Sequence, residues 1–109
     1  MTFDEYQVAV ERTAGTNILT ARLGSFGMGL SGEAGEVTDY LKKVLYHNHP
    51  LDRQKMFEEL GDVLWYVAAL ATTCDLSLAE IAEYNIAKLK KRYPNGFESE
   101  KSIRREETR

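Results

Sequence analysis

Apolar residues recur at helical spacing in four segments of this chain. In the first segment Thr2 and Glu5 form a capping box, and the pattern predicts a helix over about residues 2–14. Four glycines follow, so residues 15–29 are expected to form a loop or a loose start to the next helix. A second helix is predicted over about residues 25–46.

The third predicted helix begins at the N-cap Asp52 and runs to about Thr73. From Val63 to Ala71 it is apolar nearly all round, which is typical of a helix buried on every side. A chain of 109 residues can hardly cover such a helix alone. This favours a homo-oligomer, either a dimer or a tetramer.

A fourth helix is predicted from the capping pair Ser77 and Glu80 to about Tyr93. No segment has the alternation of a strand, so the fold class is all-α, a bundle of about four helices. Residues 1–97 form the predicted domain. Residues 98–109 are almost all charged or polar, and we expect a flexible tail.

Composition narrows the possible functions. The chain is 43% hydrophobic and 28% charged, with a net charge of −3, which is unfavourable for binding duplex nucleic acid. The single Cys74 cannot form an internal disulfide, and the N-terminus lacks the basic and apolar regions of a signal peptide. No apolar run is long enough to span a bilayer. We therefore expect a cytoplasmic protein that has no membrane partner.

An acidic motif occurs twice, and it is the strongest chemical signal in the chain. Glu33 and Glu36 lie three residues apart in the second predicted helix, as Glu59 and Asp62 do in the third. Residues three apart share a helix face, so facing helices would bring four carboxylates together. Such a cluster needs a cation, and all-oxygen ligands favour Mg²⁺ first and Mn²⁺ second.

Both copies of the motif contain an internal glycine, and each runs into apolar residues. Gly32 and Gly35 are costly inside a helix, which suggests that another backbone or a ligand comes close there. The alternative is that these acids simply decorate a solvated helix face. Glu58 precedes the second motif by one residue, and we expect it to be a neighbouring or surface acid, with Glu59 as the ligand.

Other polar and aromatic residues leave alternatives open. Lys43 and Lys55 are surface lysines or phosphate contacts, and His47-Asn48-His49 is a polar loop more readily than a metal pair. Trp65 and Tyr66 could stack on a base, although core or subunit-interface positions fit so apolar a helix better.

A basic strip follows in the fourth predicted helix. Asn85, Lys88 and Arg92 share one face, which suits a polyphosphate chain. The helix dipole alone also favours basic residues near a helix C-terminus.

From about residue 29 to 97 the sequence resembles the MazG family of nucleoside triphosphate pyrophosphohydrolases. The family pattern is Glu-x-x-Glu, a variable gap and then Glu-x-x-Asp, and both halves of the acidic motif fit it. The resemblance implies Mg²⁺-dependent cleavage between the α and β phosphates in a dimer or tetramer. It assigns catalytic and metal-binding roles to the acids, Glu33, Glu36, Glu59 and Asp62, and substrate contacts to Asn85, Lys88, Arg92 and Tyr93.

Two other functions remain open at this point. One is the related phosphoribosyl-ATP pyrophosphohydrolase reaction, which uses similar metal chemistry on a different nucleotide. The other is a non-enzymatic helical interaction module whose acids are merely solvated.

Overall fold

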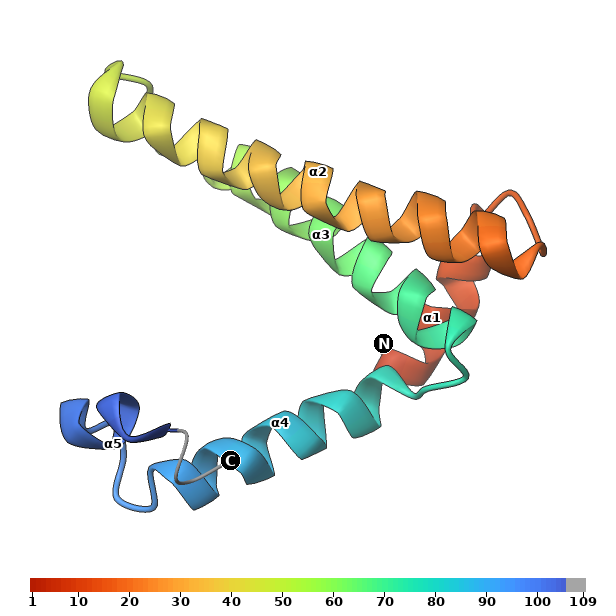
Figure 1. Ribbon diagram of the computed structural model, residues 1–109. Coiled ribbons are helices and arrows are strands. Elements are labelled where there is room, and N and C mark those ends of the chain that lie inside the picture. The colour runs from red at the N-terminus through yellow and green to blue at the C-terminus, as the bar shows by residue number, and fades with distance from the viewer. Residues whose placement is uncertain (106–109) are drawn as a thin grey trace.

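Five helices make up the part of the chain that the computed structural model describes, residues 1–105 (Figure 1). They are α1 (Phe3–Glu11), α2 (Leu19–Tyr46), α3 (Arg53–Thr73), α4 (Leu78–Arg92) and the short α5 (Ser99–Ile103). No strand occurs within residues 1–105, where a single isolated bridge joins Pro94 and Gly96. The predicted all-α class is therefore confirmed.

Side-chain caps fix three of the helix starts close to the predicted positions. Thr2 and Glu5 form both hydrogen bonds of the capping box at α1. The Asp52 carboxylate accepts from the backbone N–H of Gln54, and the Ser77 hydroxyl accepts from that of Glu80. These caps satisfy backbone donors that would otherwise lack a partner.

Residues 15–29, for which a loop or a loose start to the next helix is expected, are helical over most of that segment, so the loop alternative is wrong there. Of its glycines only Gly15 has a left-handed backbone, and α2 begins at Leu19. Helix packing against α3 outweighs the poor helix propensity of the later glycines, since Phe26 is buried there.

A close approach does occur at one glycine of α2, but not where the sequence suggested it. A Cβ built at Gly29 would overlap the ring of Tyr66 on α3, whereas nothing lies within 4 Å of one built at Gly32 or Gly35. Tyr66 has little room to move, because its ring packs against Trp65 and Phe26 at centroid distances of 5.0 and 6.3 Å. Gly29 thus allows α2 and α3 to lie close together.

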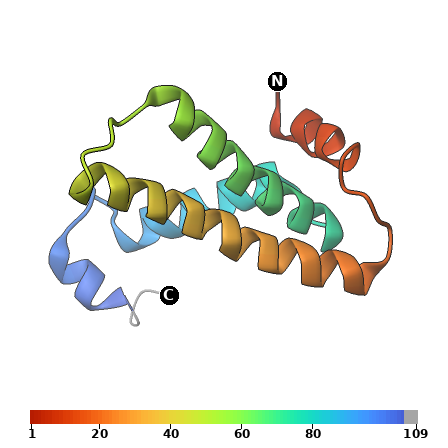
Figure 2. The same ribbon diagram turned by 90° about the horizontal axis from the view of Figure 1, so that it is seen from above.

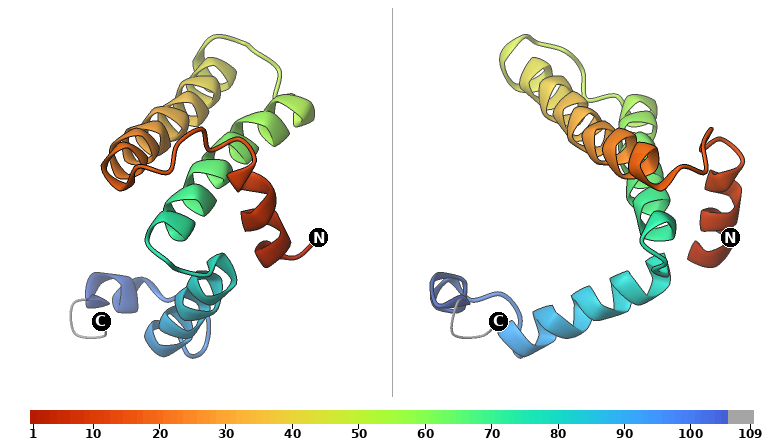
Figure 3. Two further views of the ribbon diagram at one scale, coloured as in Figure 1. Left: turned by 90° about the vertical axis from the view of Figure 1, so that its right-hand side faces the viewer. Right: turned by 45° about the vertical axis from the view of Figure 1, so that its right-hand side comes forward.

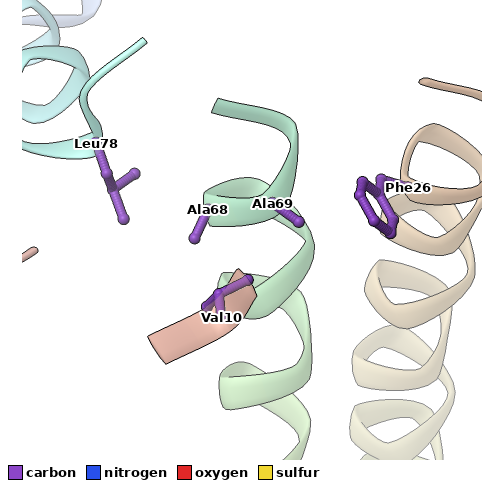
Figure 4. Close-up of a cluster of buried hydrophobic side chains, with 5 residues drawn as sticks. All are labelled: Val10, Phe26, Ala68, Ala69 and Leu78. Atoms are coloured by element: carbon purple, nitrogen blue, oxygen red, sulfur yellow. The ribbon is translucent and has the colours of Figure 1, made fainter. Parts of the chain in front are cut away.

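The core sits where α1, α2 and the start of α4 meet α3. Figure 4 shows Ala68 and Ala69 pointing to opposite sides of α3, toward Leu78 and Phe26, with Val10 of α1 below them. Small residues on α3 let three neighbours approach its backbone. Seen from above, α1 and α2 lie on different sides of α3 (Figure 2).

Polar side chains fasten α1 and the following turn to this core. The buried Arg22 guanidinium donates to both carboxylate oxygens of Glu11, to the Thr16 carbonyl and to the Thr73 hydroxyl. Because each guanidinium nitrogen has a partner and Glu11 supplies the opposite charge, the buried charge is compensated. The amide of Gln7 joins α1 to the α3–α4 connection in the same way, accepting from the Leu78 N–H.

The α4 helix leaves the core after its first turn and extends away from the α2–α3 pair (Figure 3). The expected bundle is consequently open in a single chain, with a radius of gyration of 16.9 Å. A compact domain of this length would have about 13 Å. In the predicted flexible tail, Ser99–Ile103 form α5, and residues 106–109 lie outside the described part.

The expected complete burial of α3 is not met within one chain. Within residues 63–71 the three alanines are buried, but Leu64 is 37% exposed, and earlier on the helix Phe57 and Leu60 are 63% and 53% exposed. No single described helix is long and apolar enough to cross a membrane, while α3 and α4 reach that length and composition only together, across a bend of 103°.

Replacing Gly29 with alanine should destabilise the fold by about 1–3 kcal/mol, since the new methyl group would overlap the confined ring of Tyr66. Urea denaturation measures the change. The matched control is Gly27→Ala on the same helix, where a Cβ meets nothing within 4 Å. That variant should gain up to about 1 kcal/mol from helix propensity. Equal effects of the two substitutions would contradict the close contact.

Candidate metal centre

Three carboxylates from two helices converge on one small volume. Glu33 of α2 and Glu59 and Asp62 of α3 each offer an oxygen, and these atoms all lie within 4.8 Å of one another. Side chains three residues apart share a helix face, and the pairing of α2 with α3 places Glu33 opposite that face. The structure therefore brings acids of both motif copies together.

Glu59 is the most enclosed member of this group, at 8% exposed. Lys55, one turn earlier on α3, places its Nζ 2.9 Å from Glu59 Oε1. This bond is the main reason why the pKa of the Lys55 ammonium is raised. Lys43 instead pairs with Asp39 at 3.1 Å, and Glu58 is exposed and outside the group of three.

The carboxylates of the group repel one another. The pKa of Glu33 is raised first by partial burial and then by the negative charges of Asp62, Glu59 and Glu36. Glu36 is exposed and stands outside the three converging oxygens, yet its charge still acts on both Glu33 and Lys55. Among the described residues Lys55 forms its ion pair with Glu59, so Glu33 and Asp62 leave the group with excess negative charge.

The donor set fits a hard divalent cation. It consists of carboxylate oxygens alone, with no imidazole or thiolate, which favours Mg²⁺ or Mn²⁺ over Zn²⁺. His47 and His49 lie exposed in the α2–α3 connection and belong to no metal-binding group among the described residues.

A pocket of about 320 Å³ opens beside the acids. Glu33 and Asp62 line it together with Thr13, Trp65 and Tyr66. The two aromatic residues follow Asp62 by three and four positions, which places them on the same face of α3.

Thr13 comes from the turn after α1, and sequence reasoning missed it. Its hydroxyl accepts a hydrogen bond from Trp65 Nε1 at 3.0 Å. A threonine in a turn carries no motif, so only the packing of α1 on α3 reveals its position beside the acids.

The predicted substrate contacts of α4 do not reach this pocket in a single chain. Asn85 and Lys88 are exposed, and Arg92 and Tyr93 are half-buried at the far end of α4, near Phe97. The Nε of Arg92 is buried and has no hydrogen-bond partner among the described residues. None of the four lines the pocket beside Glu33 and Asp62.

Comparison with known proteins identifies the family. Residues 24–97 match the MazG nucleotide pyrophosphohydrolase domain, which covers most of the chain and confirms the resemblance seen in the acidic motif. Gene 37 protein of Mycobacterium phage L5 is similar, with 37% identity over 105 residues, 88% of this chain and 92% of that protein. No solved structure matches the chain. The span of the domain match places this chain in the MazG nucleotide pyrophosphohydrolase family.

Proposed function

We propose that this protein hydrolyses nucleoside triphosphates between the α and β phosphates, releasing a nucleoside monophosphate and pyrophosphate. The observation that carries the proposal is the convergence of Glu33, Glu59 and Asp62 beside a pocket, in a chain of this family. Mg²⁺ is the proposed cofactor, with Mn²⁺ as a substitute. A cytoplasmic location, expected from the sequence, remains a prediction.

The acids of α2 and α3 would hold the cation. Bound Mg²⁺ neutralises phosphate charge and makes a coordinated water a better nucleophile. Glu33, Glu59 and Asp62 are the proposed ligands, and Glu36 completes the set by a change of rotamer, since it lies one turn beyond Glu33. Lys55 compensates part of the charge of Glu59. When a cation binds Glu59, the Lys55 ammonium would be released from this ion pair and could contact a phosphate.

The proposed assembly is a homodimer or homotetramer. One chain is more extended than a compact domain of its length, and large apolar residues such as Phe57, Leu60 and Tyr84 remain exposed. A pocket of about 380 Å³, lined mostly by apolar residues, lies on the outer face of α3 over Met56, Phe57, Leu60 and Leu64. We propose that a second copy covers this face.

Assembly would also bring α4 to a substrate. Its basic strip lies away from the acids of its own chain. Asn85, Lys88, Arg92 and Tyr93 would contact substrate phosphates at the centre of a second copy. The positive charges of Lys88 and Arg92 support this proposal, because ammonium and guanidinium groups bind phosphate.

Substituting the acids one at a time tests the centre. Glu33→Gln, Glu36→Gln and Glu59→Gln should each lower kcat for Mg²⁺-dependent pyrophosphate release by about 100-fold or more, since each removes a charge that holds the cation. Glu58→Gln is the matched control, because Glu58 adjoins Glu59 but stands outside the converging group, and it should retain activity. Circular dichroism verifies folding. Wild-type turnover by Glu59→Gln would refute the assignment.

Adding Mg²⁺ should stabilise the folded protein. A cation that binds only the native state at 100 times its Kd adds about 2.7 kcal/mol to the free energy of unfolding. Thermal denaturation at rising MgCl₂, with NaCl at equal ionic strength as the control, measures the effect. Glu59→Gln should lose most of it. A solvated interaction module would give the same melting temperature in both salts.

The mass in solution tests the assembly. Sedimentation equilibrium should give a multiple of the 12.4 kDa chain mass for the wild type. Phe57→Glu should shift the equilibrium toward the monomer, because it places a charge in the outer face of α3. Val8→Glu is the control, since Val8 is also exposed but lies outside that pocket. A monomeric wild type would contradict the proposal.

A further inference from the structure

The pocket beside the acids has two chemically different walls. One wall holds the carboxylates of Glu33 and Asp62, which would face phosphates through a cation. The other holds Thr13, Trp65 and Tyr66, and no basic side chain lines the pocket. Without a cation or a basic group this second wall offers a phosphate no opposite charge, whereas a flat neutral ring can lie against an aromatic side chain.

Packing fixes the orientation of the Trp65 indole. Its ring meets Phe26 edge-to-face at 5.4 Å and Tyr66 at 5.0 Å, and its Nε1 donates to Thr13 Oγ1 at 3.0 Å. Contacts on three sides reduce the rotamer freedom that stacking on a ligand would otherwise have to remove. Trp65 therefore provides a preorganised surface for a base.

In the observed geometry the Thr13 hydroxyl is positioned to accept a further hydrogen bond. It lies 3.2 Å from the Val10 carbonyl oxygen, which cannot donate, so the hydroxyl proton goes to Val10. The indole N–H cannot accept, so it takes one lone pair of the same oxygen. One lone pair remains for a ligand, and the carboxylates on the opposite wall are acceptors as well.

We propose that this second wall binds the nucleobase, with the base on Trp65, and that Thr13 selects bases carrying an exocyclic amino group. The exocyclic groups of a base project furthest from its ring, so they would contact Thr13 before the ring atoms do. The amino groups of cytosine and adenine donate, while the carbonyls at the same positions in uracil and hypoxanthine only accept. A carbonyl could receive the Thr13 proton only if the hydroxyl gave up its hydrogen bond to Val10.

This inference rests on the proposed function for the identity of the ligand, but its test does not depend on turnover. Trp65 is the only tryptophan in the chain, so quenching of its fluorescence reports occupancy of the wall. Titration with Mg²⁺ present should give a Kd for CMP roughly threefold to tenfold below that for UMP, the contribution of one net hydrogen bond. AMP and IMP should differ in the same direction.

Variants separate selection from simple support of Trp65. Thr13→Val keeps the shape and removes the hydroxyl, so the CMP/UMP ratio should fall to within about twofold. Thr13→Ser should restore the ratio. Thr38→Val is the matched control: the Thr38 hydroxyl also donates to a backbone carbonyl, at 3.2 Å, but lies outside the pocket, and its variant should keep the wild-type ratio. A purely structural Thr13 would weaken both ligands equally and leave the ratio unchanged.

Measuring pyrophosphate release from CTP, UTP, ATP and ITP then distinguishes a failure of the proposed base selection from a failure of the proposed function. Turnover with equal kcat/KM within each pair would overturn the selection by Thr13 and leave the proposed function standing. Unequal quenching by CMP and UMP without any turnover would overturn the proposed function and leave the base wall standing. Absence of quenching by every nucleotide would overturn the base wall itself.

Discussion

Mutual repulsion between carboxylates on α2 and α3 is the constraint on which the candidate site depends. Like charges repel, so Glu33, Glu59 and Asp62 would separate if only their charges mattered, and the charges of Asp62 and Glu59 help to raise the pKa of Glu33. Helix packing opposes that separation. Phe26 lies against Ala69, and Gly29 admits Tyr66, so the two helices are held together within two turns of the acids. The site therefore stores an electrostatic cost that a divalent cation removes.

Much of the fold follows from local sequence signals. The caps at Thr2, Asp52 and Ser77 act within one turn of helix, so their residue spacing alone locates three helix starts. The acidic motif is equally local, because three-residue spacing dictates a shared face. These features can therefore be predicted from the sequence without knowledge of the tertiary structure.

Features that depend on distant contacts were not predictable in this way. Glycine propensity favours a loop or a loose helix start before residue 29, but burial of Phe26 against α3 extends α2 back to Leu19. Thr13 has no motif, and its place in the pocket depends on the docking of α1. The direction of α4 is set at the α3–α4 connection, where Asp75 adopts a left-handed backbone conformation. No local sequence pattern predicts this conformation.

One helix face supplies both halves of the candidate site. On α3 the carboxylate of Asp62 is followed at helical spacing by the aromatic side chains of Trp65 and Tyr66. The helix therefore fixes the distance between the charged and the aromatic part of the pocket. A change in the register between α2 and α3 would move Glu33 relative to both at once. The contact of Gly29 with Tyr66 sets that register only one turn from Glu33. A glycine with no chemistry of its own thus determines where the acids of α2 lie relative to the aromatic wall.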